Sequence, residues 1–157
     1  MMEKVGVEVE SPLQAEVAAL LAQSDAVAAQ LYPGEYRRPI TPDILAKPGT
    51  SVLVARLAGA AAGLCVVFWR GDGTAELKRM IVDERARGQG LGAVLLGGAE
   101  AEARRLGASM VLLEVGVRNT EAQALYRGAG YEACEPFPPY QQSPVSTFLR
   151  KIIAQDR

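Results

Sequence analysis

The chain has 157 residues, of which 49% are hydrophobic and 22% charged, so the composition indicates one folded domain (1–157) that buries an apolar core. Its 17 Lys and Arg residues balance 18 Asp and Glu residues, which excludes a global basic field that attracts nucleic acid. The chain contains no histidine, so histidine bases, histidine triads and histidine metal ligands are excluded.

Cysteine usage and hydropathy narrow the class of protein further. Cys65 and Cys134 lie far apart in apolar surroundings and form no C-x-x-C pair, so we expect reduced thiols and no metal site. No apolar run approaches the roughly 20 residues of a membrane span, and the N-terminus lacks the apolar stretch of a signal peptide. The sequence therefore predicts a cytoplasmic protein that binds neither membrane nor nucleic acid.

Alternating and helically spaced apolar residues predict the element order β-α-(α)-β-β-β-α-β-α-β-β. Strands are expected at residues 5–10, 51–57, 63–70, 74–82, 109–115, 131–134 and 145–153. Helices are expected from Ser11-Pro12 to Gln30, from 90 to 106 and from 120 to 129, with a short helix in the loop 31–47. Thr120 and Gln123 have the spacing of a capping box. Strands that alternate with helices in the second half favour a layered α/β fold with a partly parallel sheet.

A glycine-rich loop follows the strand that ends at Val82. Four residues intervene before Arg87, and Gly88, Gly90 and Gly92 then alternate with other residues at the start of a helix. Glycine lets a ligand approach the backbone because no Cβ stands in the way. The first turn of a helix also has unpaired N–H groups and the positive end of the helix dipole. The loop therefore predicts a phosphate or pyrophosphate site.

Three segments, in the same order, resemble the GCN5-related N-acetyltransferase (GNAT) family. They are residues 76–82 with the glycine loop, residues 112–115 followed by Asn119, and residues 124–131. The third segment resembles the signature A-x-x-L-Y-x-x-x-G-F/Y with one residue fewer between Ala and Leu, and counting from Ala122 restores the spacing. The resemblance covers residues 74–134 and implies the acyl-CoA N-acyltransferase fold. In this α/β fold, a mixed, mostly antiparallel sheet of about seven strands is splayed between the fourth and fifth strands, and helices cover both faces.

The resemblance implies acetyl-CoA as the cosubstrate and no metal. The cofactor would enter the splay with its pyrophosphate on the main chain of the glycine loop and its pantetheine arm paired to the preceding strand. The residues implied in cofactor binding are Met80, Ile81, Val82, Arg87, Gly88, Gln89, Gly90, Leu91, Gly92, Asn119 and Tyr126. Asn119 is equally well explained as the residue that starts a helix.

Acetylation of an amine needs a base for the amine, donors for the thioester oxygen and an acid for the departing thiolate. Without histidine, carboxylates and tyrosines must move the protons. Glu76 is the first candidate for the base, and the alternative is a surface glutamate paired with Lys78 or Arg79. Glu114, on the facing strand, is the second candidate, with a buried or half-buried structural carboxylate as its alternative. Tyr126 is the candidate acid, or else a core aromatic residue.

The acceptor is expected to be a primary amine of a small molecule or peptide that attacks the thioester directly in a ternary complex, because no motif places a nucleophilic cysteine. Tyr32 and Glu35 fall on the loop that helps to form the acceptor site in the family. Lys78 and Arg79, beside the candidate base, are placed to hold an acceptor carboxylate. A homodimer is one option for the assembly, because dimers are common in the family.

Two other functions match parts of the sequence. Gly88-x-Gly90-x-x-Ala93 satisfies a dinucleotide-binding fingerprint, but the charged residues 83–87 separate it from its strand and too little chain remains for a substrate domain. A protein that binds acyl-CoA without turnover, as a sensor or interaction module, is the alternative to an enzyme. The Pro-rich stretch 135–144 is long for a compact domain, and connections of this kind are more often functional than accidental.

Overall fold

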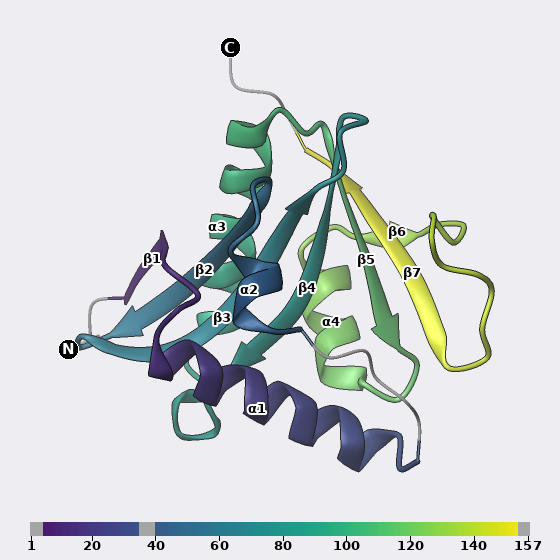
Figure 1. Ribbon diagram of the computed structural model, residues 1–157. Coiled ribbons are helices and arrows are strands. Elements are labelled where there is room, and N and C mark those ends of the chain that lie inside the picture. The colour runs from purple at the N-terminus through teal and green to yellow at the C-terminus, as the bar shows by residue number, and fades with distance from the viewer. Residues whose placement is uncertain (1–4, 35–39, 154–157) are drawn as a thin grey trace.

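The computed structural model describes residues 5–34 and 40–153, which form a seven-stranded sheet with helices on both faces (Figure 1). The strands are β1 (Val5–Val9), β2 (Thr50–Leu57), β3 (Ala60–Trp69), β4 (Thr74–Val82), β5 (Met110–Gly116), β6 (Glu132–Ala133) and β7 (Ser146–Ile152). The helices are α1 (Ala15–Leu31), α2 (Pro42–Leu45), α3 (Leu91–Leu106) and α4 (Thr120–Gly128), with a 3₁₀ turn, η1, at Glu84–Ala86. The predicted order of elements is confirmed.

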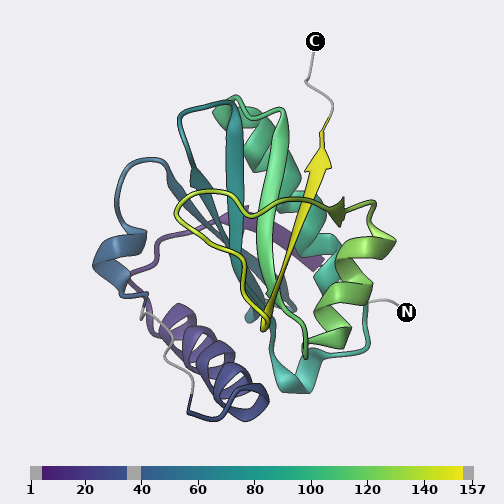
Figure 2. The same ribbon diagram turned by 90° about the vertical axis from the view of Figure 1, so that its right-hand side faces the viewer.

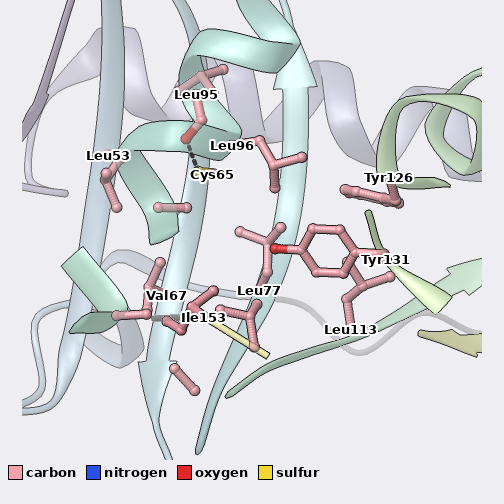
Figure 3. Close-up of a cluster of buried hydrophobic side chains, with 14 of the residues drawn as sticks. Leu53, Cys65, Val67, Leu77, Leu95, Leu96, Leu113, Tyr126, Tyr131 and Ile153 are labelled. Carbon is pink, nitrogen blue, oxygen red and sulfur yellow. Dashed lines mark hydrogen bonds between the residues drawn. The ribbon is translucent and has the colours of Figure 1, made fainter. Parts of the chain in front are cut away.

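Alternation along the central strands gives the sheet two apolar faces. Figure 2 shows α1 and α2 on one side of the sheet and α3 and α4 on the other. On the side of α1 and α2, the core contains Val17, Leu20, Leu21, Leu45, Val52, Val54, Leu64, Val66 and Ile81. On the side of α3 and α4, it includes Leu53, Cys65, Val67, Leu77, Leu95, Leu96, Leu113, Tyr126, Tyr131 and Ile153 (Figure 3). On β2 and β3, alternate residues therefore face opposite sides of the sheet.

The sheet splays at its centre. The strands lie in the order β1-β2-β3-β4-β5-β7-β6, and β4 and β5 are paired in parallel from Thr74 and Met110 as far as Leu77 and Leu113. Beyond that point β4 continues to Val82 and β5 to Gly116, but the two strands no longer pair with each other, and Figure 1 shows them diverging. The other strand pairs in the described part of the chain are antiparallel. The predicted mixed sheet, splayed between its fourth and fifth strands, is therefore confirmed.

A β-bulge in β4 lies beside this splay. Leu64 of β3 pairs with Ile81, but Val66 pairs with Lys78, so β4 carries one extra residue between these two pairs. Arg79, within the bulge, has a φ of 58°, which is uncommon for a residue with a side chain. Bulges bend a strand and redirect its side chains, and they recur next to active sites. The sequence pattern gave no indication of this bulge.

The hairpin predicted around residues 58–60 is confirmed, and its turn is only two residues long. Ala58 and Gly59 connect β2 to β3 with φ angles of 51° and 84°. Two successive positive φ angles are typical of the type I′ turn, whose twist matches that of the flanking strands.

One predicted helix start is wrong, whereas α4 begins at Thr120 as predicted and differs only in its cap. The first helix begins at Ala15 rather than at Ser11-Pro12. The Ser11 hydroxyl instead accepts a hydrogen bond from the N–H of Leu13 at 3.1 Å, which stabilises a turn before the helix. In α4, Asn119 rather than Thr120 is the N-cap, because its side chain accepts from the N–H of Ala122 at 3.2 Å. The predicted capping box is therefore replaced by an asparagine cap.

The strand expected at residues 131–134 is shorter than predicted, since β6 covers only Glu132–Ala133. Within residues 5–34 and 40–153, no helix combines the length and the apolar character that crossing a membrane requires.

Candidate active site

A cleft of about 1140 Å³ opens where β4 and β5 diverge. Its walls come from the C-terminal half of α1, the end of β4, the glycine loop, the end of β5, α4 and the segment before β7. The sequence-predicted residues that line it are Tyr32, Glu76, Lys78, Arg79, Met80, Ile81, Val82, Arg87, Gly88, Gly90, Leu91, Gly92, Glu114, Asn119 and Tyr126. Gln89 does not line the cleft. The fold thus gathers nearly all of the predicted site residues around a single cavity.

The glycine loop forms one end of the cleft and leads directly into α3. Gly88 and Gly90 have φ angles of 82° and 80°, and a Cβ on either residue would meet no heavy atom within 4 Å. Gly90 is the N-cap of α3. Within the described residues, the main-chain N–H groups of residues 87–92 donate to no acceptor of the protein. These glycines therefore leave open space over a row of unpaired amides at a helix N-terminus, an arrangement suited to an anion.

Asp83 fixes the start of this loop. Its carboxylate accepts hydrogen bonds from the N–H of Arg85 at 2.9 Å and from the Gln23 side-chain amide at 3.0 Å. Gln23, on α1, also accepts from the N–H of Glu84 at 3.3 Å. These bonds, with the main-chain N–H of Arg85 foremost, lower the pKa of Asp83 to about 2. The loop is therefore tied to α1 by an ionised carboxylate.

The end of β4 carries the residues expected to meet the pantetheine arm. The Ile81 side chain is buried in the core on the α1 side, so only its main chain can serve a ligand in the cleft. Val82 is half-buried, and its carbonyl accepts a hydrogen bond from the Arg87 guanidinium at 3.2 Å. Arg87 thus braces the glycine loop against the strand that precedes it.

Asn119 and Tyr126 line the opposite wall, from the N-terminus and the middle of α4. Asn119 has the helix-starting role that the sequence left open. The Tyr126 side chain is 6% exposed, and its ring centroid lies 5.8 Å from that of Tyr131. Burial raises the pKa of the Tyr126 phenol, so this group stays protonated at neutral pH. Tyr126 is therefore a core aromatic residue that also reaches the cleft.

Glu76 lies at the other end of the cleft. It is paired with Lys78, as the alternative interpretation expects, but it is buried rather than at the surface. It is 6% exposed and accepts a hydrogen bond from the Tyr140 hydroxyl at 2.6 Å. The Lys78 ammonium lies 3.8 Å from the same carboxylate oxygen, and the Arg70 guanidinium lies 3.9 Å from the other. The Lys78 ammonium also lies over the rings of Phe68 and Tyr140, at 5.6 and 5.4 Å from their centroids.

Glu114 is exposed, which contradicts the alternative of a buried or half-buried structural carboxylate. Its carboxylate accepts a hydrogen bond from the Ser146 hydroxyl at the start of β7. The two candidate bases therefore differ in environment, since Glu76 is enclosed by cations and a phenol whereas Glu114 faces solvent.

Tyr32 closes the cleft from the end of α1. Its hydroxyl accepts from the N–H of Arg118 at 2.7 Å, and the Arg118 guanidinium lies 5.1 Å from the Tyr32 ring centroid. A Cβ on Gly116 would clash with the Tyr32 ring, so a glycine is needed at the end of β5 for this closure. The position predicted for Glu35 lies outside the described residues.

Tyr140 and Arg70 are site residues that the sequence interpretation missed. Both contact Glu76, but one comes from the Pro-rich stretch and the other from the turn between β3 and β4. Neither belongs to a local motif, and the only available signal was the unusual length of the Pro-rich stretch.

Comparison with known proteins gives a consistent result. Residues 18–131 match the model of the acetyltransferase (GNAT) family. An IAA acetyltransferase of Azospirillum brasilense is 40% identical over 151 residues, which are 96% of this chain and 99% of that protein.

Solved structures also resemble this fold. A Klebsiella pneumoniae protein described as an acyl-CoA N-acyltransferase is 32% identical, with a TM-score of 0.80 over 94% of this chain and 97% of that one. A GNAT acetyltransferase of Elizabethkingia anophelis with acetyl-CoA bound is 16% identical and has the same fold, with a TM-score of 0.69 over 95% of this chain and 98% of that one. With its splayed sheet and its glycine loop, the chain belongs to the GNAT family and is an acetyl-CoA-dependent acetyltransferase.

Proposed function

We propose that the protein transfers the acetyl group of acetyl-CoA to a primary amine of a small molecule or peptide, by direct attack in a ternary complex. The observation that carries this proposal is the continuity of the cleft, which joins the unpaired amides of residues 87–92 to Glu76. Such a cavity suits a cofactor whose anionic end binds the amides and whose reactive end lies near Glu76.

The cofactor is held mainly by main-chain groups. The amides of residues 87–92 and the dipole of α3 bind the pyrophosphate. The main chain of Met80 and Val82, on the part of β4 that does not pair with β5, pairs with the amides of the pantetheine arm as an added strand would. Both residues line the cleft beyond the point where β5 stops pairing. Asn119 and Tyr126 lie beside the pantetheine arm, on the side of α4.

The chemistry begins with loss of a proton from the acceptor. An alkylamine has a pKa of about 10 and is mostly protonated at neutral pH, so it needs a base. Glu76 takes this role because it is an enclosed carboxylate at the end of the cleft, and Glu114 is the second candidate. The free amine then attacks the thioester carbon, and a main-chain N–H near Val82 stabilises the oxyanion.

Departure of the CoA thiolate completes the reaction. The Tyr126 phenol, whose pKa is raised by burial, is protonated at neutral pH and supplies the proton. An acyl-enzyme through Cys65 is disfavoured, because burial raises the pKa of that thiol to about 12 and the nucleophilic species is the thiolate. Direct transfer is therefore the simpler path.

The name of the Azospirillum relative suggests a further acceptor to test. Because that relative is 40% identical over 96% of this chain, IAA is included in the acceptor panel beside the amines. Tyr32, Lys78 and Arg79 line the cleft and are proposed as acceptor-site residues, with the two basic side chains as the groups that would meet an acceptor carboxylate.

Replacement of Glu76 by Gln tests the assignment of the base. We expect kcat to fall about a hundredfold or more at neutral pH. The loss should shrink as the pH rises towards about 10, where the amine is already neutral. The measurement is release of free CoA thiol across the pH range.

Glu114→Gln is the matched control, since it removes a carboxylate from the facing wall of the same cleft. If Glu114→Gln shows the pH-dependent loss and Glu76→Gln does not, the base is Glu114. If wild-type protein binds acetyl-CoA but releases no thiol with any acceptor, a non-catalytic acyl-CoA-binding module is the better description.

A further inference from the structure

The Pro-rich strap, defined as residues 135–144, packs against the sheet beside the acceptor end of the cleft. Figure 2 shows it leaving β6 on the side of α4 and bending across the edge of the sheet towards the side of α1 and α2. Phe137 and Tyr140 of the strap form an aromatic cluster with Phe148 of β7, with ring centroids 5.1 to 5.7 Å apart. Phe137 is 7% exposed. The strap is therefore a packed part of the fold.

Arg70 fastens the strap to the site. Its guanidinium donates a hydrogen bond to the carbonyl of Pro138 at 2.9 Å and lies 5.1 Å from the Phe137 ring centroid. The same guanidinium lies 3.9 Å from the Glu76 carboxylate. One side chain therefore sets the position of the strap relative to Glu76.

Tyr140 and Glu76 both line the cleft, and Tyr140 is the more exposed of the two. The Glu76 side chain is only 7% exposed, whereas Tyr140 is half-buried and lines the cleft. The Tyr140 hydroxyl donates to the Glu76 carboxylate at 2.6 Å. Burial, together with the bond to Glu76, raises the pKa of Tyr140, so the phenol is neutral at the pH of the reaction. A neutral phenol both donates and accepts a hydrogen bond.

We propose that Tyr140 carries the proton of the acceptor amine to Glu76. The ammonium N–H bond breaks as its proton moves to the Tyr140 oxygen, and the Tyr140 O–H bond breaks as that proton moves to Glu76. The amine gains its lone pair, Glu76 becomes a neutral carboxylic acid, and Tyr140 is unchanged. This inference rests on the proposed role of Glu76 as the base.

The test is Tyr140→Phe, which removes the hydroxyl and keeps the ring that packs on Phe137 and Phe148. We expect kcat to fall about tenfold to a hundredfold at neutral pH and to recover as the pH rises, with the KM for acetyl-CoA unchanged. Because the two groups act in one relay, Tyr140→Phe combined with Glu76→Gln should be no slower than Glu76→Gln alone.

Tyr131→Phe is the matched control. The Tyr131 hydroxyl also donates to a carboxylate, that of Glu100, at 3.0 Å, but neither residue lines the cleft. It should lower the thermal stability about as much as Tyr140→Phe while leaving the pH profile of kcat unchanged.

The outcomes separate this inference from the proposed function. If Glu76→Gln lowers kcat and Tyr140→Phe keeps the wild-type pH profile of kcat, the relay is wrong, but the assignment of Glu76 as the base is supported. Losses that multiply in the double variant also overturn the relay, because they mean that the two groups act independently. If Glu76→Gln is unimpaired, the assignment of the base fails and the relay fails with it.

Discussion

The carboxylates of Asp83 and Glu76 have different roles because they have different hydrogen-bond and ionic partners. Asp83 accepts hydrogen bonds from a main-chain N–H and from a side-chain amide, and both favour its charged form. Glu76 instead accepts a short hydrogen bond from the Tyr140 phenol, and the cationic groups of Lys78 and Arg70 lie farther away, at 3.8 and 3.9 Å. The first carboxylate holds a loop in place, and the second is enclosed beside the site of the proposed reaction.

The pKa of Asp83 leads to a prediction about acid stability. Its folded-state pKa is about 2, below the ordinary value of 3.8. Its contribution to stability is therefore complete above the ordinary value and is lost as the pH falls through about 2. Asp83→Asn cannot ionise, so the difference in free energy of unfolding between wild type and variant should be constant near neutral pH and should shrink below about pH 4.

Urea unfolding at a series of pH values measures this difference. A difference that stays the same from pH 7 to pH 3 would mean that the Asp83 carboxylate does not stabilise the start of the loop.

At the scale of secondary structure, the junction between β4 and α3 forms the cofactor end of the site. η1 and the glycine loop connect the two elements, and Gly90 begins the helix in the left-handed region. A Cβ there would point into open space. A larger residue at Gly90 therefore affects the protein in two ways, through backbone strain and through obstruction of the ligand.

Gly90→Val and Gly59→Val separate the two effects. Gly90 and Gly59 have φ angles of 80° and 84°, and a Cβ on either residue would meet no heavy atom within 4 Å. Each substitution should therefore cost about 1–2 kcal/mol of stability from backbone strain. Gly59 lies in the β2–β3 turn and does not line the cleft, so only Gly90→Val should raise the KM for acetyl-CoA.

Chemical unfolding and steady-state kinetics measure the two effects. Equal values of KM for acetyl-CoA in the two variants would show that the loop does not contact the cofactor.

For the whole molecule, the sequence predicted the elements and their order well, because apolar periodicity is strong in the strands and in α3. The glycine loop and the Leu125-Tyr126 segment are local motifs, so they could be recognised without a structure. The splay between β4 and β5 was predicted only through the family resemblance. Periodicity specifies which residues are buried, but it does not specify where two paired strands separate.

The features that sequence could not predict depend on tertiary contacts. The bulge at Arg79 depends on the pairing of β4 with β3. Tyr140 reaches Glu76 across 64 positions of sequence, and no spacing rule connects two residues so far apart. Long-range contacts of this kind decide the details of the acceptor end.

The central claim is that the unpaired amides of residues 87–92 bind the pyrophosphate of coenzyme A. Isothermal titration of the wild type and of Gly90→Val with acetyl-CoA and with acetyl-pantetheine, which lacks the pyrophosphate, tests it directly. Gly90→Val should weaken the binding of acetyl-CoA about tenfold, which corresponds to about 1.4 kcal/mol, and should leave the binding of acetyl-pantetheine unchanged. Equal weakening of both ligands, or of neither, would contradict it.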